Sequence, residues 1–301
     1  MSVMRPVLNL WLRLTEKPHL ARAATPERLR RSFEMKARLF FRAPRGTVYH
    51  ASQIIHKEQG VPVLHISPET PGDGPVILYF HGGGYVFGSP HTHKAMVARL
   101  CAETGLRAVL PDYRKAPEHA FPAAIDDALA AYMAVADHPG GVVIGGDSAG
   151  GGMALALLGE ITRLGARQPA GVFAFSPLTD QTYCGGSIIT NAKADVVLPA
   201  QRVDEMAGMY LQGQDAGDPR ASPLRADFTG ACPVWLTVGD TEILLDDTRR
   251  MAAALRGQGV EVSEHVEHDL PHVWPLFHNL LPEARVTLRD LGRWITSLSR
   301  P

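Results

Sequence analysis

The sequence predicts an α/β fold in which a mostly parallel central sheet is flanked by helices. Three observations support this fold class. From residue 76 onward, short apolar runs alternate with segments of helical periodicity, which is the pattern of parallel strands joined by crossover helices. The run at 76–80 (VILYF) is apolar throughout, as expected of a strand that is buried on both faces. The length of 301 residues allows one large domain of this kind or two smaller ones.

The expected elements follow in chain order. Two strands come first, at 48–55 and 61–66, and a segment rich in Pro and Gly separates them from the alternating part. The strands expected in the alternating part are 76–80, 107–110, 142–144, 172–175, 234–238 and 260–266. The helices expected between them are 93–104, 123–136, 153–164 and 248–255. Gly165 follows the third of these helices, where a left-handed C-terminal cap is expected.

Two segments do not fit the strand–helix alternation. Residues 1–45 have a helical, basic pattern in which leucines and Trp11 lie among many arginines, which indicates an amphipathic surface helix. Residues from about 183 to 215 form a mixed, partly helical insertion after a strand. Such an insertion can cover the ends of the strands. We expect it to form a cap together with N-terminal cap helices over 1–45. The main domain then spans 46–301, with a cap insertion at about 183–215.

The composition excludes several classes of function. The formal net charge is −1, with 45% hydrophobic and 20% charged residues. This balance argues against a nucleic-acid partner, because such partners usually require a basic excess or patch. The 13 histidines are scattered, and neither an HExxH nor a CxxC motif occurs. We therefore expect no bound metal.

The cysteines and the apolar segments predict a cytoplasmic protein. Cys101, Cys184 and Cys232 are odd in number and far apart, which argues against a disulfide framework and favours a reducing compartment. The apolar run at 7–14 is too short to span a bilayer, and Arg13 interrupts it. No small-residue cleavage site follows it. The expectation is a soluble protein without stable membrane insertion.

A serine between glycines is the first sign of chemistry. Gly146-Asp-Ser148-Ala-Gly150 lies between a predicted buried strand and a predicted helix. This is the context of a nucleophile elbow, where the serine occupies a tight, strained turn and larger neighbours would clash. The N-terminus of the following helix also favours negative charge there. The alternative is a glycine-rich turn that only links strand and helix. The predicted nucleophile is Ser148.

A second glycine motif, HGGG at 81–84, follows the first buried strand of the alternating part. Ester hydrolysis places negative charge on the former carbonyl oxygen, and backbone N–H groups aimed at that oxygen stabilise it. Gly83 and Gly84 are the predicted donors, with Ala149 after the nucleophile as the third. A phosphate-binding loop is the alternative, but the GxxxxGK[ST] and GxGxxG spacings are absent. His81 is interpreted as a residue that braces the loop.

A serine nucleophile needs a histidine base that a carboxylate orients. In enzymes with a nucleophile elbow, the chain order is serine, acid and histidine. His272 follows the last predicted strand and is the predicted base. His268, just before the loop, is the alternative base. Otherwise His268, like His265 within the strand, is interpreted as a surface residue.

Four carboxylates follow the strand predicted at 234–238. Asp246 and Asp247 precede a predicted helix, where acidic residues stabilise the helix N-terminus. Asp240 and Glu242 lie in the loop beyond the strand. Glu242 is the favoured acid, and Asp240 and Asp246 stay open as alternatives.

Together, these motifs resemble the hormone-sensitive-lipase-like branch of the α/β-hydrolases, often called bacterial esterase family IV. The matching segments are HGGGYVFGS, DYRKAPEHAFPAAIDDA, GGDSAGG and SPLTD, followed by the acid loop and His272, so the resemblance covers most of residues 60–290. It implies an α/β-hydrolase fold with a helical cap, and hydrolysis of short- and medium-chain acyl esters without a cofactor. Asp112, Arg114 and Glu118 match the family's DYR-x-APE segment and are interpreted as structural.

One position departs from the family pattern. Most relatives carry Asp-Pro-Leu at the acid, whereas this sequence has Glu242-Ile-Leu. Matching the two position by position places Glu242 where the aspartate usually stands, and some family members resemble this chain in using glutamate.

The sequence thus predicts a serine carboxylesterase with a triad of Ser148, Glu242 and His272 and an acyl-enzyme intermediate. The expected partners are small acyl esters and, from the resemblance, a second copy of the chain in a homodimer. A non-catalytic small-molecule receptor on the same fold is one alternative, although such receptors typically lack the histidine. An interfacial lipase is another, suggested by the basic N-terminal helix. An amidase or peptidase would use the same triad.

Overall fold

The computed structural model describes residues 2–23, 25–56 and 59–298. Within these residues one eight-stranded sheet runs in the order β1-β2-β4-β3-β5-β6-β7-β8. Its strands are β1 (Thr47–His56), β2 (Gln59–Pro68), β3 (Val76–Phe80), β4 (Ala108–Pro111), β5 (Val142–Asp147), β6 (Gly171–Phe175), β7 (Val234–Gly239) and β8 (Val262–Glu267). Neighbours from β4 to β8 pair in parallel, whereas β2 pairs antiparallel with both β1 and β4. The mostly parallel sheet predicted from the sequence is confirmed.

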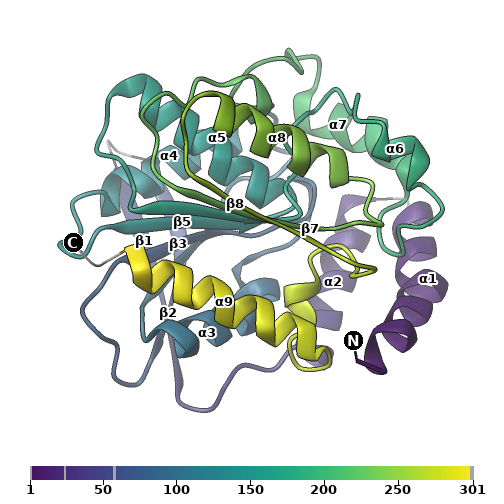
Figure 1. Ribbon diagram of the computed structural model, residues 1–301, viewed down its shortest axis with the longest axis horizontal. Helices are drawn as coiled ribbons and strands as arrows, with labels where there is room; N and C mark the ends of the chain where they lie inside the picture. The colour runs from purple at the N-terminus through teal and green to yellow at the C-terminus, as the bar shows by residue number, and fades with distance from the viewer. Residues whose placement is uncertain (1, 24, 57–58, 299–301) are drawn as a thin grey trace.

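Helices cover both faces of this sheet (Figure 1). The α-helices are α1 (Met4–Arg22), α2 (Pro26–Phe40), α3 (Pro90–Thr104), α4 (Ala123–Val135), α5 (Ala149–Leu164), α6 (Ser187–Thr190), α7 (Val203–Leu211), α8 (Leu245–Gly257) and α9 (Pro282–Leu298). Helices α3 and α9 pack on one face, and α4, α5 and α8 pack on the other. Among the helices of the described residues, none is long and apolar enough to cross a bilayer.

The apolar strands divide their side chains between two cores. Along β3, Leu78 and Phe80 belong to the cluster that includes α4, α5 and α8. Ile77 and Tyr79 belong to the cluster that includes α3 and α9. Successive side chains of a strand point to opposite faces, so a strand covered on both sides must be apolar at every position. Full burial of one such side chain contributes about 1.5–3 kcal/mol.

Helix α5 begins earlier than its apolar spacing predicts, at Ala149 rather than near residue 153. Glycine disfavours a helix interior, which is why the sequence pattern starts late. Here the glycines allow close packing: a Cβ on Gly150 would lie 2.1 Å from the backbone oxygen of Phe80, and one on Gly152 would lie 1.9 Å from that of Leu178. Gly165 ends the helix in the left-handed conformation, as expected.

The C-terminal helix α9 is an element that the sequence analysis does not assign. Its buried face includes Leu288, Leu291 and Ile295 and packs in the same cluster as α3. Without α9, the strand residues on that face of the sheet would lack part of their cover.

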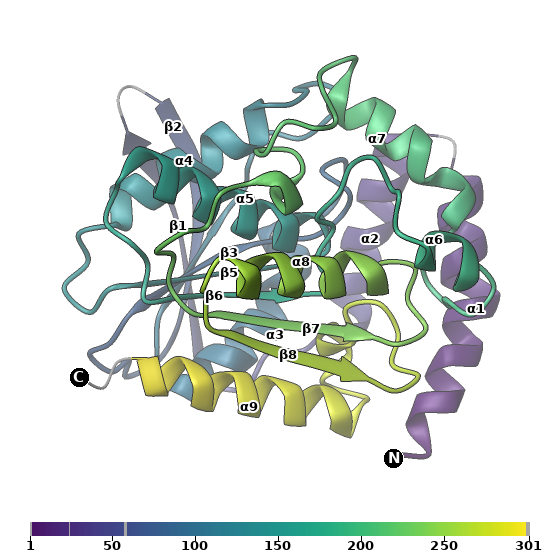
Figure 2. The same ribbon diagram turned by 45° about the horizontal axis from the view of Figure 1, so that its top comes forward.

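Four of the helices, α1, α2, α6 and α7, gather at one end of the sheet, the end to which the arrows of β7 and β8 point (Figure 2). Helices α1 and α2 come from the N-terminal segment, and α6 and α7 come from the chain between β6 and β7. These are the two segments that the sequence sets apart from the strand–helix alternation. They lie at the edge of the sheet that the carboxyl ends of the parallel strands form.

Candidate active site

Every candidate site residue follows the carboxyl end of a parallel strand. The glycine loop follows β3, Ser148 follows β5, Glu242 follows β7 and His272 follows β8. Carboxyl ends of parallel strands meet at one edge of a sheet, which is where ligands bind in open α/β sheets. The topology therefore brings together residues that lie up to 190 positions apart in the chain.

Ser148 occupies a sharp turn between β5 and α5. Its backbone has φ 53° and ψ −121°, a combination that is uncommon for a non-glycine residue and marks local strain. The turn is held by a 2.8 Å hydrogen bond from the Ser148 N–H to the carbonyl oxygen of Phe175. A Cβ on Gly146 would lie 2.2 Å from the Gly150 oxygen. This crowding explains why both flanking positions are glycine.

The glycine loop contains backbone N–H groups without a hydrogen-bond partner among the described residues. Gly83 has φ 122° and Gly84 has φ 59°, and a Cβ on Gly83 would lie 2.2 Å from the Phe87 oxygen. Neither N–H donates a hydrogen bond within the part of the chain that the structure describes. Ala149 is the first residue of α5, where a helix N–H has no acceptor in its own helix. Gly83 and Gly84 line the cavity that also contains Ser148, and Ala149 directly follows that serine in the chain.

His272 and Glu242 form a buried pair. His272 Nδ1 lies 2.6 Å from Glu242 Oε2. The other oxygen, Oε1, accepts hydrogen bonds from Ser176 Oγ at 2.8 Å and from the Gly239 N–H at 2.6 Å. Glu242 is only 1% exposed. Three hydrogen bonds thus hold the carboxylate against the imidazole.

The alternative site residues lie in other contacts. His268 Nδ1 pairs with Asp240 Oδ2 at 2.7 Å, and the His268 side chain is 70% exposed. Asp246 lies in the first turn of α8 and accepts a hydrogen bond from the Ser187 N–H. Asp247, in the same turn, is fully buried and accepts a 2.7 Å bond from the Thr179 N–H. The structure places these carboxylates in roles other than contact with His272.

Burial alone would lower the pKa of the His272 imidazole. Nearby carboxylates outweigh that effect and raise the pKa above its usual value of 6.5, with Glu242 contributing most and Asp195 and Asp147 adding to it. His81 shows the opposite balance: burial, together with the nearby positive charge of Lys115, lowers its pKa well below 6.5. His81 stacks on a tyrosine ring with the centroids 4.2 Å apart. This neutral, buried state fits the bracing role predicted for it.

Asp195 is a buried carboxylate from the insertion that the sequence analysis does not single out. Its Oδ2 accepts a hydrogen bond from the Ile243 N–H at 2.9 Å, next to Glu242. Its Oδ1 accepts bonds from the N–H groups of Val197 and Leu198, both at 2.8 Å. Both of these residues line the cavity. Asp195 therefore joins the acid loop to the cavity wall.

The turn at 191–195 also contacts helix α1. Asn191 Nδ2 donates to the Glu242 carbonyl oxygen at 2.8 Å. Lys17 Nζ of α1 donates to the Asp195 carbonyl oxygen at 2.6 Å, and the Arg13 guanidinium donates to two further carbonyls of the same turn. The turn at 191–195 thus connects the N-terminal helix α1 to the acid loop by hydrogen bonds.

A cavity of about 370 Å³ contains Ser148, His272 and the three glycines of the HGGG loop. Its remaining wall is mostly apolar and comes largely from α1, α2 and the insertion. Representative lining residues are Leu8, Leu12, Leu29, Phe33, Leu198 and Met206. An apolar cavity with a few convergent polar groups is typical of a small-molecule site.

Comparisons with known proteins bear on the fold and the family of this chain. A family model of the alpha/beta hydrolase fold matches residues 77–276. A solved esterase from the bacterial hormone-sensitive lipase family superposes with a TM-score of 0.91 at 33% identity, covering 100% of this chain and 99% of its own. This chain belongs to the hormone-sensitive-lipase-like family of α/β-hydrolases. The predicted family and fold are confirmed.

Two curated relatives of this hormone-sensitive-lipase-like protein are similar over most of its length. An acetyl-hydrolase of Streptomyces hygroscopicus is 35% identical over 265 residues, which cover 84% of this chain and 89% of the relative. An esterase of Acinetobacter venetianus is 34% identical over 227 residues, or 74% of this chain and 75% of the relative.

The DYR-x-APE segment of this family member makes structural contacts. Arg114 forms an ion pair with Asp127, and Glu118 forms a bidentate pair with Arg30 of α2. Asp112 pairs with Lys115. Their interpretation as structural residues agrees with these contacts.

Ser176, the first residue of SPLTD, supports the Glu242 carboxylate in this family member. It follows β6, has φ 47°, and its Oγ also accepts a bond from the Val273 N–H at 3.2 Å. Its position directly after a buried strand could mark Ser176 as a site residue in the sequence, although no sequence pattern pairs it with Glu242.

We predict that Ser176→Ala lowers kcat for ester hydrolysis about tenfold to hundredfold and changes KM little, because a hydrogen bond to a charged group contributes about 1.5–3 kcal/mol. Steady-state kinetics with p-nitrophenyl butyrate measure both constants. Ser222→Ala is the matched control, since Ser222 is equally buried and its hydroxyl bonds Gln181 and Ala216 instead. Equal losses in the two variants would contradict a specific role for Ser176.

Proposed function

We propose that this chain is a serine carboxylesterase that hydrolyses short- to medium-chain acyl esters through an acyl-enzyme intermediate. The observation that carries the proposal is that His272, which is paired with the buried Glu242, lines the same cavity as a serine in a strained elbow. The names of the relatives, acetyl-hydrolase and esterase, support ester substrates. The hydrogen-bonded His272–Glu242 pair also argues against a non-catalytic receptor, because ligand binding alone does not require a histidine that a carboxylate orients.

Acylation begins when Ser148 Oγ attacks the ester carbonyl and its proton passes to Nε2 of His272. The negative charge of Glu242 stabilises the imidazolium and fixes the ring with Nε2 toward the serine. The backbone N–H groups of Gly83, Gly84 and Ala149 bind the oxyanion of the tetrahedral intermediate. Its collapse breaks the C–O bond to the alcohol, which leaves with the proton from His272.

Deacylation repeats these steps with water. His272 takes a proton from a water molecule, whose oxygen attacks the carbonyl of the acyl-enzyme. The same three N–H groups bind the second oxyanion. The intermediate collapses to the free carboxylic acid, and Ser148 regains its proton from His272. No cofactor takes part in either half of the proposed reaction.

We propose further that α1, α2 and the insertion at 183–215 form a cap that sets the size of the substrate. Their apolar side chains close the cavity over Ser148. A volume of about 370 Å³ accommodates a short or medium acyl chain with its alcohol.

A series of p-nitrophenyl esters from acetate to palmitate tests the proposed substrate class. We expect the highest kcat/KM on butyrate or hexanoate and little turnover of palmitate, because the longest chain exceeds the cavity. A preference for emulsified palmitate over the soluble short esters would instead identify an interfacial lipase. No turnover of any ester by the folded chain would contradict the proposed function.

The raised pKa of His272 predicts the pH dependence of the reaction. The base must be neutral, so kcat/KM should fall as the pH drops through a value above 6.5. Asp195→Asn removes one of the charges that raise this pKa, so the acid limb should move to lower pH. Profiles of kcat/KM against pH for p-nitrophenyl butyrate measure the shift. Asp240→Asn is the control, because Asp240 pairs with His268; identical limbs in both variants would refute the role of Asp195.

A further inference from the structure

The charge of this protein is distributed unevenly along the chain. Residues 1–45 contain eleven Lys and Arg against three Asp and Glu, whereas the whole chain contains 30 against 31. The rest of the chain therefore carries nine more acidic than basic residues. Because residues 4–22 and 26–40 form α1 and α2, a net charge near zero conceals a strongly basic pair of helices beside the cavity.

Helix α1 and its N-cap residue Val3 present a row of apolar side chains to solvent. Val3, Val7, Leu10 and Leu14 are 83%, 57%, 58% and 67% exposed. Their spacing of three or four residues places them on one face of the helix. The opposite side of α1 buries Leu8 and Leu12 in the protein. The exposed row is thus a second apolar face, which folding does not bury.

Helix α2 presents a face that mixes bases with apolar side chains. Arg28, Arg31, Met35, Arg38 and Leu39 share the helical spacing, and all five are exposed. Among the described residues, the three arginine side chains have no ion-pair partner. Helices with apolar residues beside Lys and Arg are typical of segments that lie on a lipid surface.

These exposed faces border the mouth of the cavity. Val7, Trp11, Phe40 and Leu280 line the cavity and are also exposed by 37% to 57%. Trp11 and Phe40 contact each other across the two helices with ring centroids 5.6 Å apart. A ligand that covered the exposed faces would therefore lie over the cavity mouth.

We propose that the docking face, which comprises the exposed side chains of α1 and α2 named above, binds the surface of an anionic phospholipid bilayer. The apolar side chains enter the boundary between headgroups and acyl chains, and the arginines contact the headgroup phosphates. A second copy of the chain is a poorer occupant, because pairing the face with itself would bring two strongly basic surfaces together. A nucleic acid would leave the apolar side chains without a partner. This binding does not depend on the chemistry proposed at Ser148.

Sedimentation of the full chain with vesicles tests this proposal. One set contains phosphatidylcholine alone, and the other contains phosphatidylcholine with phosphatidylglycerol. We expect binding to the anionic vesicles, weaker binding to the neutral ones, and a loss of binding as salt is raised. Arg28→Gln/Arg31→Gln/Arg38→Gln should weaken binding at least about tenfold. Leu14→Ser/Leu39→Ser should also weaken it, since both side chains lie outside the cavity.

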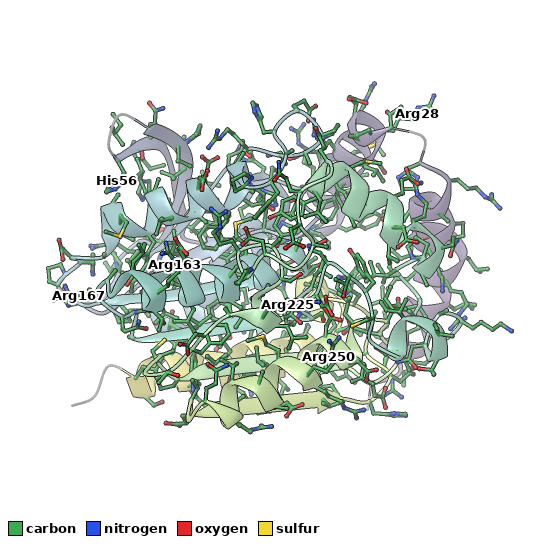
Figure 3. All side chains as sticks on the ribbon, turned by 90° about the horizontal axis from the view of Figure 1, so that it is seen from above. Arg28, His56, Arg163, Arg167, Arg225 and Arg250 are labelled. Atoms are coloured by element: carbon green, nitrogen blue, oxygen red, sulfur yellow. The ribbon has the colours of Figure 1, made fainter. Side chains whose placement is uncertain are left out.

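Matched controls remove the same kinds of side chain elsewhere. Figure 3 shows Arg28 on one side of the molecule and Arg163 and Arg167 on the other. Arg163→Gln/Arg167→Gln/Arg289→Gln and Leu164→Ser/Val286→Ser should bind vesicles as the unmodified chain does. Turnover of soluble p-nitrophenyl acetate should be unchanged in all four variants. The proposal fails if the anionic vesicles do not bind, if controls and docking-face variants bind alike, or if the face mediates a dimer in solution that excludes vesicles.

Discussion

Replacement of Ser148 by alanine is expected to reduce ester hydrolysis by at least about 10⁴-fold, because the proposed nucleophile is removed while only the oxyanion donors remain. The fold should persist. The elbow is held by backbone groups of Ser148, including the 2.8 Å bond to Phe175 and a 3.0 Å bond from the Leu178 N–H. Hydrolysis of p-nitrophenyl butyrate measures the loss, and thermal melting by circular dichroism verifies the fold.

Covalent labelling provides an independent measurement of the same residue. A p-nitrophenyl phosphonate should release nitrophenol and add its phosphonyl group to the peptide that contains Ser148, which mass spectrometry can locate. The alanine variant should remain unlabelled. Residual hydrolysis above a small fraction, or a label on another residue, would rule out Ser148 as the nucleophile.

Replacement of Glu242 by glutamine is expected to lower kcat about 10⁴-fold, the size of effect seen when the acid of a serine triad becomes an amide. Glutamine keeps the shape of the side chain and can still accept the bonds from Ser176 and Gly239. It removes the negative charge that stabilises the His272 imidazolium, and its amide can hold the wrong tautomer.

Asp240→Asn is the control for the acid. Asp240 is the other carboxylate of the same loop, and it contacts His268 and the Asp269 N–H. Its kcat on p-nitrophenyl butyrate should stay within a small factor of the unmodified chain. A larger loss in Asp240→Asn than in Glu242→Gln would reassign the acid.

The sequence predicts the features of this protein that depend on local pattern. Apolar runs locate the strands, and glycine spacing locates the turn of Ser148 and the loop of Gly83, because steric crowding there excludes every larger side chain. The order of serine, acid and histidine follows from the order of the strands. The assignment of Glu242 over Asp240 rests on a family match in the sequence, and the structure adds the 2.6 Å contact with His272.

Features that depend on contacts between distant segments cannot be predicted from the sequence. Asp195 reads as an ordinary loop residue, yet it is 1% exposed and bonds the Ile243 N–H 48 positions away. Ser176 bonds Glu242 across 66 positions. No periodicity or spacing encodes such pairs, because they arise only when the strands align and the insertion folds over them.

The contacts of α1 restrict how this protein can acquire new substrates. One side of the helix lines the cavity with residues such as Leu8 and Trp11. Arg13 and Lys17 instead donate hydrogen bonds to the turn at 191–195, which supports the acid loop. Substitutions on the cavity side can reshape specificity while the acid stays in place. Exchange or deletion of the whole helix would alter specificity and reactivity together, so selection for a new ester should proceed by point substitutions here rather than by replacement of the segment.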